Sequence, residues 1–124
     1  LNFEGNTGPY LQYAYARASS ILRKAGKFSN KISKLKEKEE IELVKYLADF
    51  NDIVKQSAET LKPNLVANYV FKLAQKFADF YERCPCLDEK DKELRETRLN
   101  LVKATRQVLK NSLNLLGIDV LEIM

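Results

Sequence analysis

The sequence of 124 residues has no histidine or tryptophan, and it has only two cysteines, three prolines and four glycines. Without histidine, the chain lacks the commonest general base and the commonest metal ligand of proteins. The cysteines flank Pro85, with nothing nearby to complete a four-ligand zinc site and without the two-residue spacing of a redox pair. We therefore expect Cys84 and Cys86 to be reduced thiols, and we expect no catalytic residue, metal or cofactor in this chain.

Long apolar runs and phosphate-binding loops are also missing. No stretch approaches the roughly 18 apolar residues that a membrane-spanning helix needs. The opening residues, LNFEGNTGPY, do not have the basic and then apolar pattern of a signal peptide. Neither GxGxxG nor the Walker A pattern occurs. We expect a cytoplasmic location with no membrane contact, and, since the first residue is not methionine, a fragment of a longer protein.

The composition is that of one folded domain, with 45% hydrophobic and 31% charged residues. The net charge is only +4, but the first 38 residues carry eight basic side chains against two acidic ones. That part therefore has a charge of +6, and the remainder has a charge of −2. A basic third on a near-neutral body fits a polyanion-binding face. A solvated, lysine-rich linker fits the charge equally well.

Apolar residues recur at steps of three and four, which predicts amphipathic helices and an all-α bundle of about four main helices. Thr7 and Pro9 indicate the start of the first helix, and Gly26 indicates its end. The polar, basic residues 26–36 read as an unusually long loop. Asp88 is the expected N-cap of the last helix. The expected helices cover residues 10–25, 37–61, 63–84 and 88–117.

Three residues of the first helix form a stripe that could bind nucleic acid. Tyr10, Tyr13 and Arg17 have the spacing i, i+3 and i+7, which places them on one side of the helix. Tyrosine rings and a guanidinium plane can stack on unpaired bases, and the guanidinium can also bind phosphates. From periodicity alone, packing of these tyrosines in the core is the alternative, and it is the favoured one.

The residue pattern adds a resemblance to a known family. Residues 2–17, NFEGNTGPYLQYAYAR, closely resemble the segment that enters the anticodon-binding domain of arginyl-tRNA synthetases. Residues 68–84, NYVFKLAQKFADFYERC, resemble the helix of that domain that ends in Phe-x-x-Phe-Tyr-x-x-Cys. Residues 98–118, RLNLVKATRQVLKNSLNLLGI, resemble its last long helix. The three blocks follow the family's order, and together they span nearly the whole chain.

The resemblance implies a function. It implies that this single domain, residues 1–124, binds the anticodon loop of tRNA(Arg) and reads the central cytosine. It further implies that catalysis belongs to a separate domain of the same chain, in a monomeric ligase that uses ATP with Mg²⁺. The residues that it places at the anticodon are Asn6, Thr7, Tyr10, Tyr13, Arg17, Tyr81 and Met124.

The chain departs from the family at two places. Tyr15 stands where the family often has histidine, and the last six residues lack the proline that is common in the family's tail. We nevertheless expect Leu113, Leu116 and Ile118 to anchor the end of the last helix. Whether residues 119–124 fold back toward Tyr13 and Tyr81 is left open by the sequence; if they do, Met124 and its carboxylate border the anticodon pocket.

Two other functions remain open. A helical protein–protein interaction module would use its aromatic residues only for packing. A related anticodon-binding domain of another class I synthetase is also helical, although the Gly-Pro-Tyr-x-Gln-Tyr segment argues against it. Lys103 and Arg106 could contact phosphates, but solvated surface charge is the favoured interpretation of both.

Overall fold

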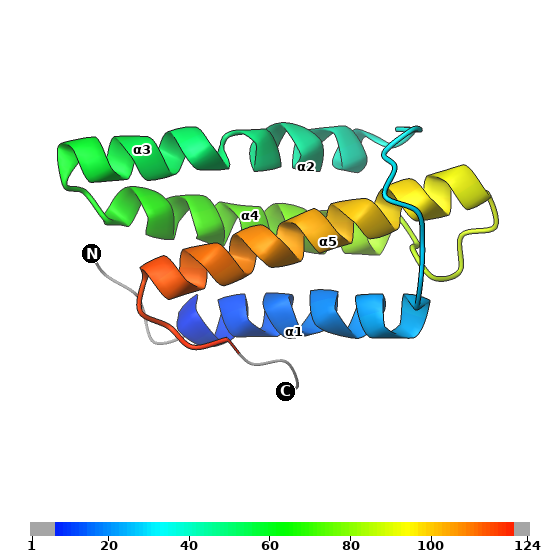
Figure 1. The fold of residues 1–124 in the computed structure, drawn as a ribbon, viewed down its shortest axis with the longest axis horizontal. Coiled ribbons are helices and arrows are strands. Elements are labelled where there is room, and N and C mark those ends of the chain that lie inside the picture. Colours follow the sequence, from blue (N-terminus) through cyan, green and yellow to red (C-terminus); the bar gives the residue numbers. More distant parts are fainter. Residues whose placement is uncertain (1–6, 121–124) are drawn as a thin grey trace.

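The computed structural model describes residues 7–120, and all regular secondary structure within that range is helical. The helices run back and forth along one long axis (Figure 1). This confirms the predicted all-α class and the predicted helical bundle. The helices are α1 Thr7–Ala25, α2 Lys38–Ala48, α3 Phe50–Thr60, α4 Asn64–Arg83 and α5 Lys92–Leu115.

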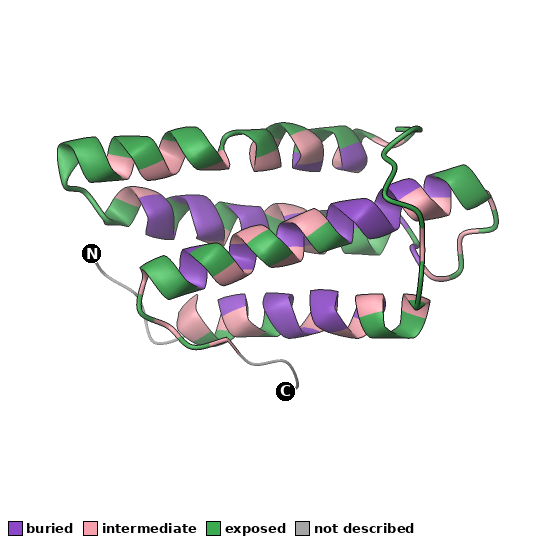
Figure 2. Ribbon diagram, viewed as in Figure 1, coloured by how far each residue is buried: buried purple, intermediate pink, exposed green. Residues whose placement is uncertain are grey.

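Helices α4 and α5 form the middle of the bundle. Figure 1 shows α2 and α3 end to end on one side of this pair and α1 on the other side. Helix α4 packs against all four other helices, and α5 packs against α1, α2 and α4. The buried faces of the helices point toward this middle, whereas α3 has no buried residue (Figure 2). The largest fully buried side chains include Tyr15, Phe77, Phe80, Leu11, Leu43, Leu73 and Leu99.

The single helix predicted over residues 37–61 is wrong, because the chain turns at Asp49 and forms α2 and α3 instead. The backbone N–H of Asp49 donates to the carbonyl of Tyr46, three residues back, which tightens the last turn of α2. Asp and Asn are frequent at this point of the sequence, and their side chains compete with helical backbone bonds. Both Tyr46 and Phe50 then pack on Tyr69 of α4, with ring centroids 4.6 and 5.8 Å away.

The last helix begins later than predicted, and the first begins earlier. The N-cap of α5 is Asp91 rather than Asp88, because Oδ1 of Asp91 accepts a hydrogen bond of 3.3 Å from the backbone N–H of Leu94. Several acidic residues stand in this stretch, and each of them is a suitable cap. Helix α1 begins at Thr7, three residues before the predicted start.

The expected loop over residues 26–36 is an extended connector that crosses α5 (Figure 1). Its backbone bonds to side chains of α5. The Thr97 hydroxyl accepts from the backbone N–H of Ser33 at 3.1 Å, and the side-chain amide of Asn100 donates to the carbonyl of Ser29 at 2.6 Å. The connector therefore has a defined path, which joins the end of α1 to the start of α2.

Candidate nucleic-acid interface

Three of the predicted RNA-binding side chains meet at one place on the surface. Tyr13 and Arg17 are one helical turn apart on α1, so both project from the same face. Tyr81 comes from the last turn of α4, which packs against α1. The guanidinium carbon of Arg17 lies 4.2 Å from the centre of the Tyr81 ring and 5.0 Å from the centre of the Tyr13 ring. Arg17 also donates a hydrogen bond to the Tyr13 hydroxyl.

We call these three side chains the aromatic–arginine cluster. It holds together through its own contacts, because a cation over an exposed aromatic ring gains about 0.5–1 kcal/mol. The rings are nevertheless accessible, since Tyr13 is 48% exposed and Tyr81 is 39% exposed. A tyrosine face can stack on a base, and a guanidinium offers both a flat surface and a fork of donors. The cluster is therefore suited to an unstacked base and its phosphate.

A cleft of about 690 Å³ opens beside the cluster. One of its walls is the face of α1 that carries Tyr13, Arg17 and Ser20. The other wall is the end of α4, with Tyr81, and residues 85–88 of the link that follows. The volume is typical of a pocket for a small organic molecule, so a single base fits the cleft.

The two walls of the cleft have opposite charge. Helix α1 contributes three cations, Arg17, Arg23 and Lys24, whereas the opposite wall contributes two carboxylates, Glu82 and Asp88. Arg23 and Lys24 belong to the last turn of α1, where the helix dipole favours cations. An anion that enters the cleft is therefore attracted to the α1 wall and repelled by the opposite one.

The link that forms the second wall is held by a buried arginine. Arg98 of α5 is 3% exposed, and its Nη1 amino group donates to the carbonyl of Pro85 and to the carboxylate of Glu89, each at 2.8 Å. Its Nε donates to Glu40 of α2, whose side chain is fully buried. Arg98 therefore ties the link to α2 and α5 and fixes the wall of the cleft. This role of Arg98 was not predicted from the sequence.

The thiols of Cys84 and Cys86, at the start of this link, are buried and unreactive. Burial raises the pKa of Cys84 to about 11 and the pKa of Cys86 to about 12. Both are therefore protonated at neutral pH, and a thiol is a poor nucleophile. Among residues 7–120 no group of three or more His, Cys, Asp or Glu side chains could hold a metal, and no helix is long and apolar enough to span a membrane.

Of the other predicted RNA-binding residues, Thr7 and Tyr10 are described by the structure, and neither joins the cluster. Tyr10 is half-buried and packs on Phe71 of α4 with ring centroids 5.5 Å apart, and burial raises the pKa of its hydroxyl. Thr7 is the first residue of α1 and is also half-buried. Asn6 and Met124 lie outside the described residues. A role in RNA binding stays a prediction for all four.

The described part of the tail folds back on the bundle, where Ile118 and Val120 pack against the core. Gly117 has a φ of 75°, a left-handed value that suits glycine, and it turns the chain out of α5. The tail then runs back toward α1 (Figure 1), where the carbonyl of Asp119 accepts a hydrogen bond of 2.8 Å from the Gln12 side chain. Gln12 directly precedes Tyr13 of the cluster. Residues 121–124 lie outside the described residues.

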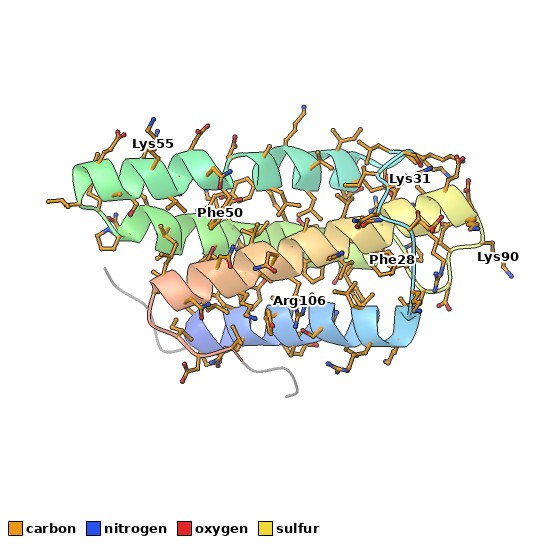
Figure 3. The ribbon with its side chains drawn as sticks, in the orientation of Figure 1. Phe28, Lys31, Phe50, Lys55, Lys90 and Arg106 are labelled. Atoms are coloured by element: carbon orange, nitrogen blue, oxygen red, sulfur yellow. The ribbon has the colours of Figure 1, made fainter. Side chains whose placement is uncertain are left out.

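Arg106 is not the solvated surface charge that we expected. It points from α5 toward α1 (Figure 3), where its guanidinium carbon lies 4.7 Å from the centre of the Tyr15 ring. Its Nε also donates to the Ser19 hydroxyl at 2.7 Å. The planar guanidinium covers one face of the Tyr15 ring, which is fully buried. Lys103 is exposed, and its ammonium lies 3.4 Å from the side-chain oxygen of Asn30.

Comparisons with known proteins point to one family. Residues 11–124 match the family model described as DALR anticodon binding domain. A curated protein named Arginine--tRNA ligase from Clostridium botulinum (strain Alaska E43 / Type E3) is 50% identical over 126 aligned residues, which cover 100% of this chain and 22% of that protein. The protein of the same name from Clostridium beijerinckii is 48% identical over the same shares. The chain thus spans about a fifth of the length of these relatives.

Solved structures agree with this match. A structure titled Thermus thermophilus arginyl-tRNA synthetase superposes with a TM-score of 0.90 at 39% identity, covering 99% of this chain and 22% of that one. A putative arginyl-tRNA synthetase from Campylobacter jejuni superposes with a TM-score of 0.83 at 21% identity, covering 96% of this chain and 27% of that one. The second likeness shows the shared fold.

Proposed function

The chain belongs to the family of DALR anticodon-binding domains, and on this premise we propose that it binds the anticodon stem-loop of tRNA(Arg) for an arginine–tRNA ligase. The relatives of that name support the choice of tRNA. The observation that carries the proposal is the aromatic–arginine cluster, in which Arg17 lies between Tyr13 and Tyr81 beside an open cleft. We place a base of the anticodon loop there, with the central cytosine as the base that is read.

The proposal assigns the chemistry of the ligase to other parts of the protein. We propose a catalytic domain in the same polypeptide that uses ATP with Mg²⁺, in a monomeric cytoplasmic enzyme. Residues 7–120 contribute stacking surfaces and cations to tRNA binding. Their two thiols are protonated at neutral pH and are therefore poor nucleophiles. The chain alone should therefore not catalyse arginine-dependent pyrophosphate exchange, and measurable exchange would contradict the assignment.

RNA binding can be measured directly. The chain is titrated into a fluorescently labelled anticodon stem-loop of tRNA(Arg), and into the same RNA with the central anticodon base changed, over a series of salt concentrations. We expect the affinity to fall steeply with salt, because neutralised phosphates release counterions. We also expect the altered RNA to bind less tightly. Absence of binding, or binding without salt dependence, would instead favour a protein–protein interaction module.

Arg17 is the residue to change. Loss of a stacking and donor group is worth about 1–3 kcal/mol, so Arg17→Ala should weaken binding roughly 5- to 150-fold. Arg17→Lys should recover little of this, because an ammonium cannot reproduce the flat fork. Arg83→Ala is the matched control, since Arg83 is exposed and faces Glu39 of α2 at 3.7 Å. Equal effects of Arg17→Ala and Arg83→Ala would refute a specific role for the cluster.

A further inference from the structure

The cationic wall of the cleft continues well beyond the aromatic–arginine cluster. Tyr13, Arg17, Ser20 and Lys24 follow one another at steps of four, three and four residues, so they form one stripe along α1. At 1.5 Å per residue this stripe is about 16 Å long. Phosphates of a stacked strand recur roughly every 3.4 Å along its axis, so the stripe is long enough for several of them. The cluster occupies only the beginning of this length.

The groups along the stripe are those that proteins use to hold a nucleic-acid backbone. Lys24 is exposed, Arg23 lines the same cleft, and Ser20 adds a half-exposed hydroxyl between them and the cluster. Arginine, lysine and serine side chains supply many of the contacts to phosphates, and such contacts fix position without reading sequence. The part of the stripe beyond the cluster can therefore hold the strand on one side of the base that the cluster binds.

The opposite wall determines on which side the backbone lies. Glu82 follows Tyr81 directly, and Asp88 belongs to the link that Arg98 holds in place. Both are exposed carboxylate side chains. Phosphates near this wall would be repelled, whereas phosphates near α1 would be attracted. The two walls of the cleft therefore differ in charge.

We propose that Arg23 and Lys24 form a phosphate-binding subsite, so that the RNA backbone runs along α1 from the cluster toward the end of the helix, away from Glu82 and Asp88. This inference rests on the proposed function, because it assumes that the cluster holds a base of an RNA loop. Beyond the proposed function, the inference gives the path of the RNA backbone along α1 and a subsite that binds phosphates regardless of the base sequence.

The test uses single-charge variants of the chain in the titration described above. Lys24→Gln removes a cation from the stripe. Lys55→Gln is the matched control, because it removes the same charge from α3, which packs on α4 and α2, and Lys55 points away from the bundle (Figure 3). Glu82→Gln removes an anion from the opposite wall. The thermal midpoint of each variant is measured in parallel, since Lys24 also interacts with the dipole at the end of α1.

A plot of log K against log salt has a negative slope, and for Lys24→Gln we expect the magnitude of this slope to be smaller by about 0.7–0.9. If the two proteins bind equally at 1 M salt, this is roughly a five- to eightfold loss of affinity at about 0.1 M salt. The loss should be equal for the two RNAs, because a phosphate contact carries no sequence information. Lys55→Gln should leave the slope unchanged. Glu82→Gln should tighten binding by about twofold, as expected for removal of one exposed like-charge contact.

Two results would overturn the inference while leaving the proposed function intact. In the first, the wild-type chain binds the stem-loop, but Lys24→Gln and Lys55→Gln have equal slopes of log K against log salt. The other is a weakening by Glu82→Gln, which would place the RNA on the acidic wall. A wild-type chain that does not bind the RNA would contradict the proposed function and the subsite together.

Discussion

Replacing Arg98 by methionine tests how the second wall of the cleft is held. The Arg98 side chain is 3% exposed and pairs with the fully buried carboxylate of Glu40. That carboxylate also accepts from the backbone N–H groups of Lys36 and Glu37, at 2.6 and 2.8 Å. Methionine fills a similar volume, but it leaves the buried carboxylate without its cation, so the variant measures the cost of an uncompensated charge.

The expected cost is large. Removal of one partner of a buried ion pair costs about 3–5 kcal/mol. Unfolding entropy is about 2.1 cal/mol/K per residue, so a chain of 124 residues changes its melting temperature by about 4 °C per kcal/mol. Arg98→Met should therefore lower the melting temperature by roughly 12–19 °C. Because whole domains are stable by only about 5–15 kcal/mol, this is a substantial fraction of the total.

The assay is thermal and urea unfolding followed by circular dichroism, with a second variant as a control. Glu40→Gln keeps an acceptor for the two backbone N–H groups and removes the charge. The double variant, Arg98→Met with Glu40→Gln, should therefore recover more than half of the stability that Arg98→Met loses. A loss below about 1 kcal/mol for Arg98→Met, or strictly additive effects in the double variant, would refute the reasoning.

Three further predictions concern stability. Tyr10→Ala should lower the melting temperature more than Tyr13→Ala does, because the Tyr10 ring packs on α4 whereas Tyr13 is half exposed; thermal melts of both variants check this. Leu61 has a φ of 56° and is 86% exposed, so Leu61→Gly should raise the free energy of unfolding in urea by roughly 0.5 kcal/mol as left-handed strain is relieved. Burial raises the pKa of Cys84 to about 11 and that of Cys86 to about 12, so the thiols of the unfolded chain ionise at lower pH than those of the folded chain. The free energy of unfolding should therefore be constant up to about pH 9 and decrease as the pH rises further. Cys86→Ala should make this decrease smaller in urea titrations at a series of pH values.

Much of the fold follows from the local sequence, and the errors have local causes. Periodic apolar residues predicted the helices, and Gly26 and Pro85 fall where α1 and α4 have ended. The break between α2 and α3 at Asp49 was not predicted, because no proline or glycine stands there. It depends instead on a modest drop in helix propensity and on the packing of Phe50 against α4. The start of α5 was placed at Asp88 because several neighbouring acidic residues make equally good caps.

The site was less accessible from the sequence than the fold. The helical stripe grouped Tyr10 with Tyr13 and Arg17, yet the structure separates Tyr10 and adds Tyr81 from another helix. Periodicity gives the face of one helix, whereas the partner across the interface depends on how the helices pack, and only the family resemblance pointed to Tyr81. Arg106 was misjudged for a related reason. A charged residue on an amphipathic helix is usually solvated, and its contact with Tyr15 appears only once α1 and α5 are packed together.

The arrangement of the cluster also explains why an arginine suits this position better than a lysine. A long side chain on a helix surface loses rotamer entropy when a ligand fixes it, and this cost is about 1.5–2 kcal/mol for arginine or lysine. Contacts with Tyr13 and Tyr81 restrict Arg17 within the chain itself, so part of the cost is met during folding. The guanidinium can remain stacked while its outer N–H groups bind a new acceptor, because it is flat and has five donors. Lys24, by contrast, is exposed at the end of α1, which is the position that the proposed phosphate-binding subsite requires.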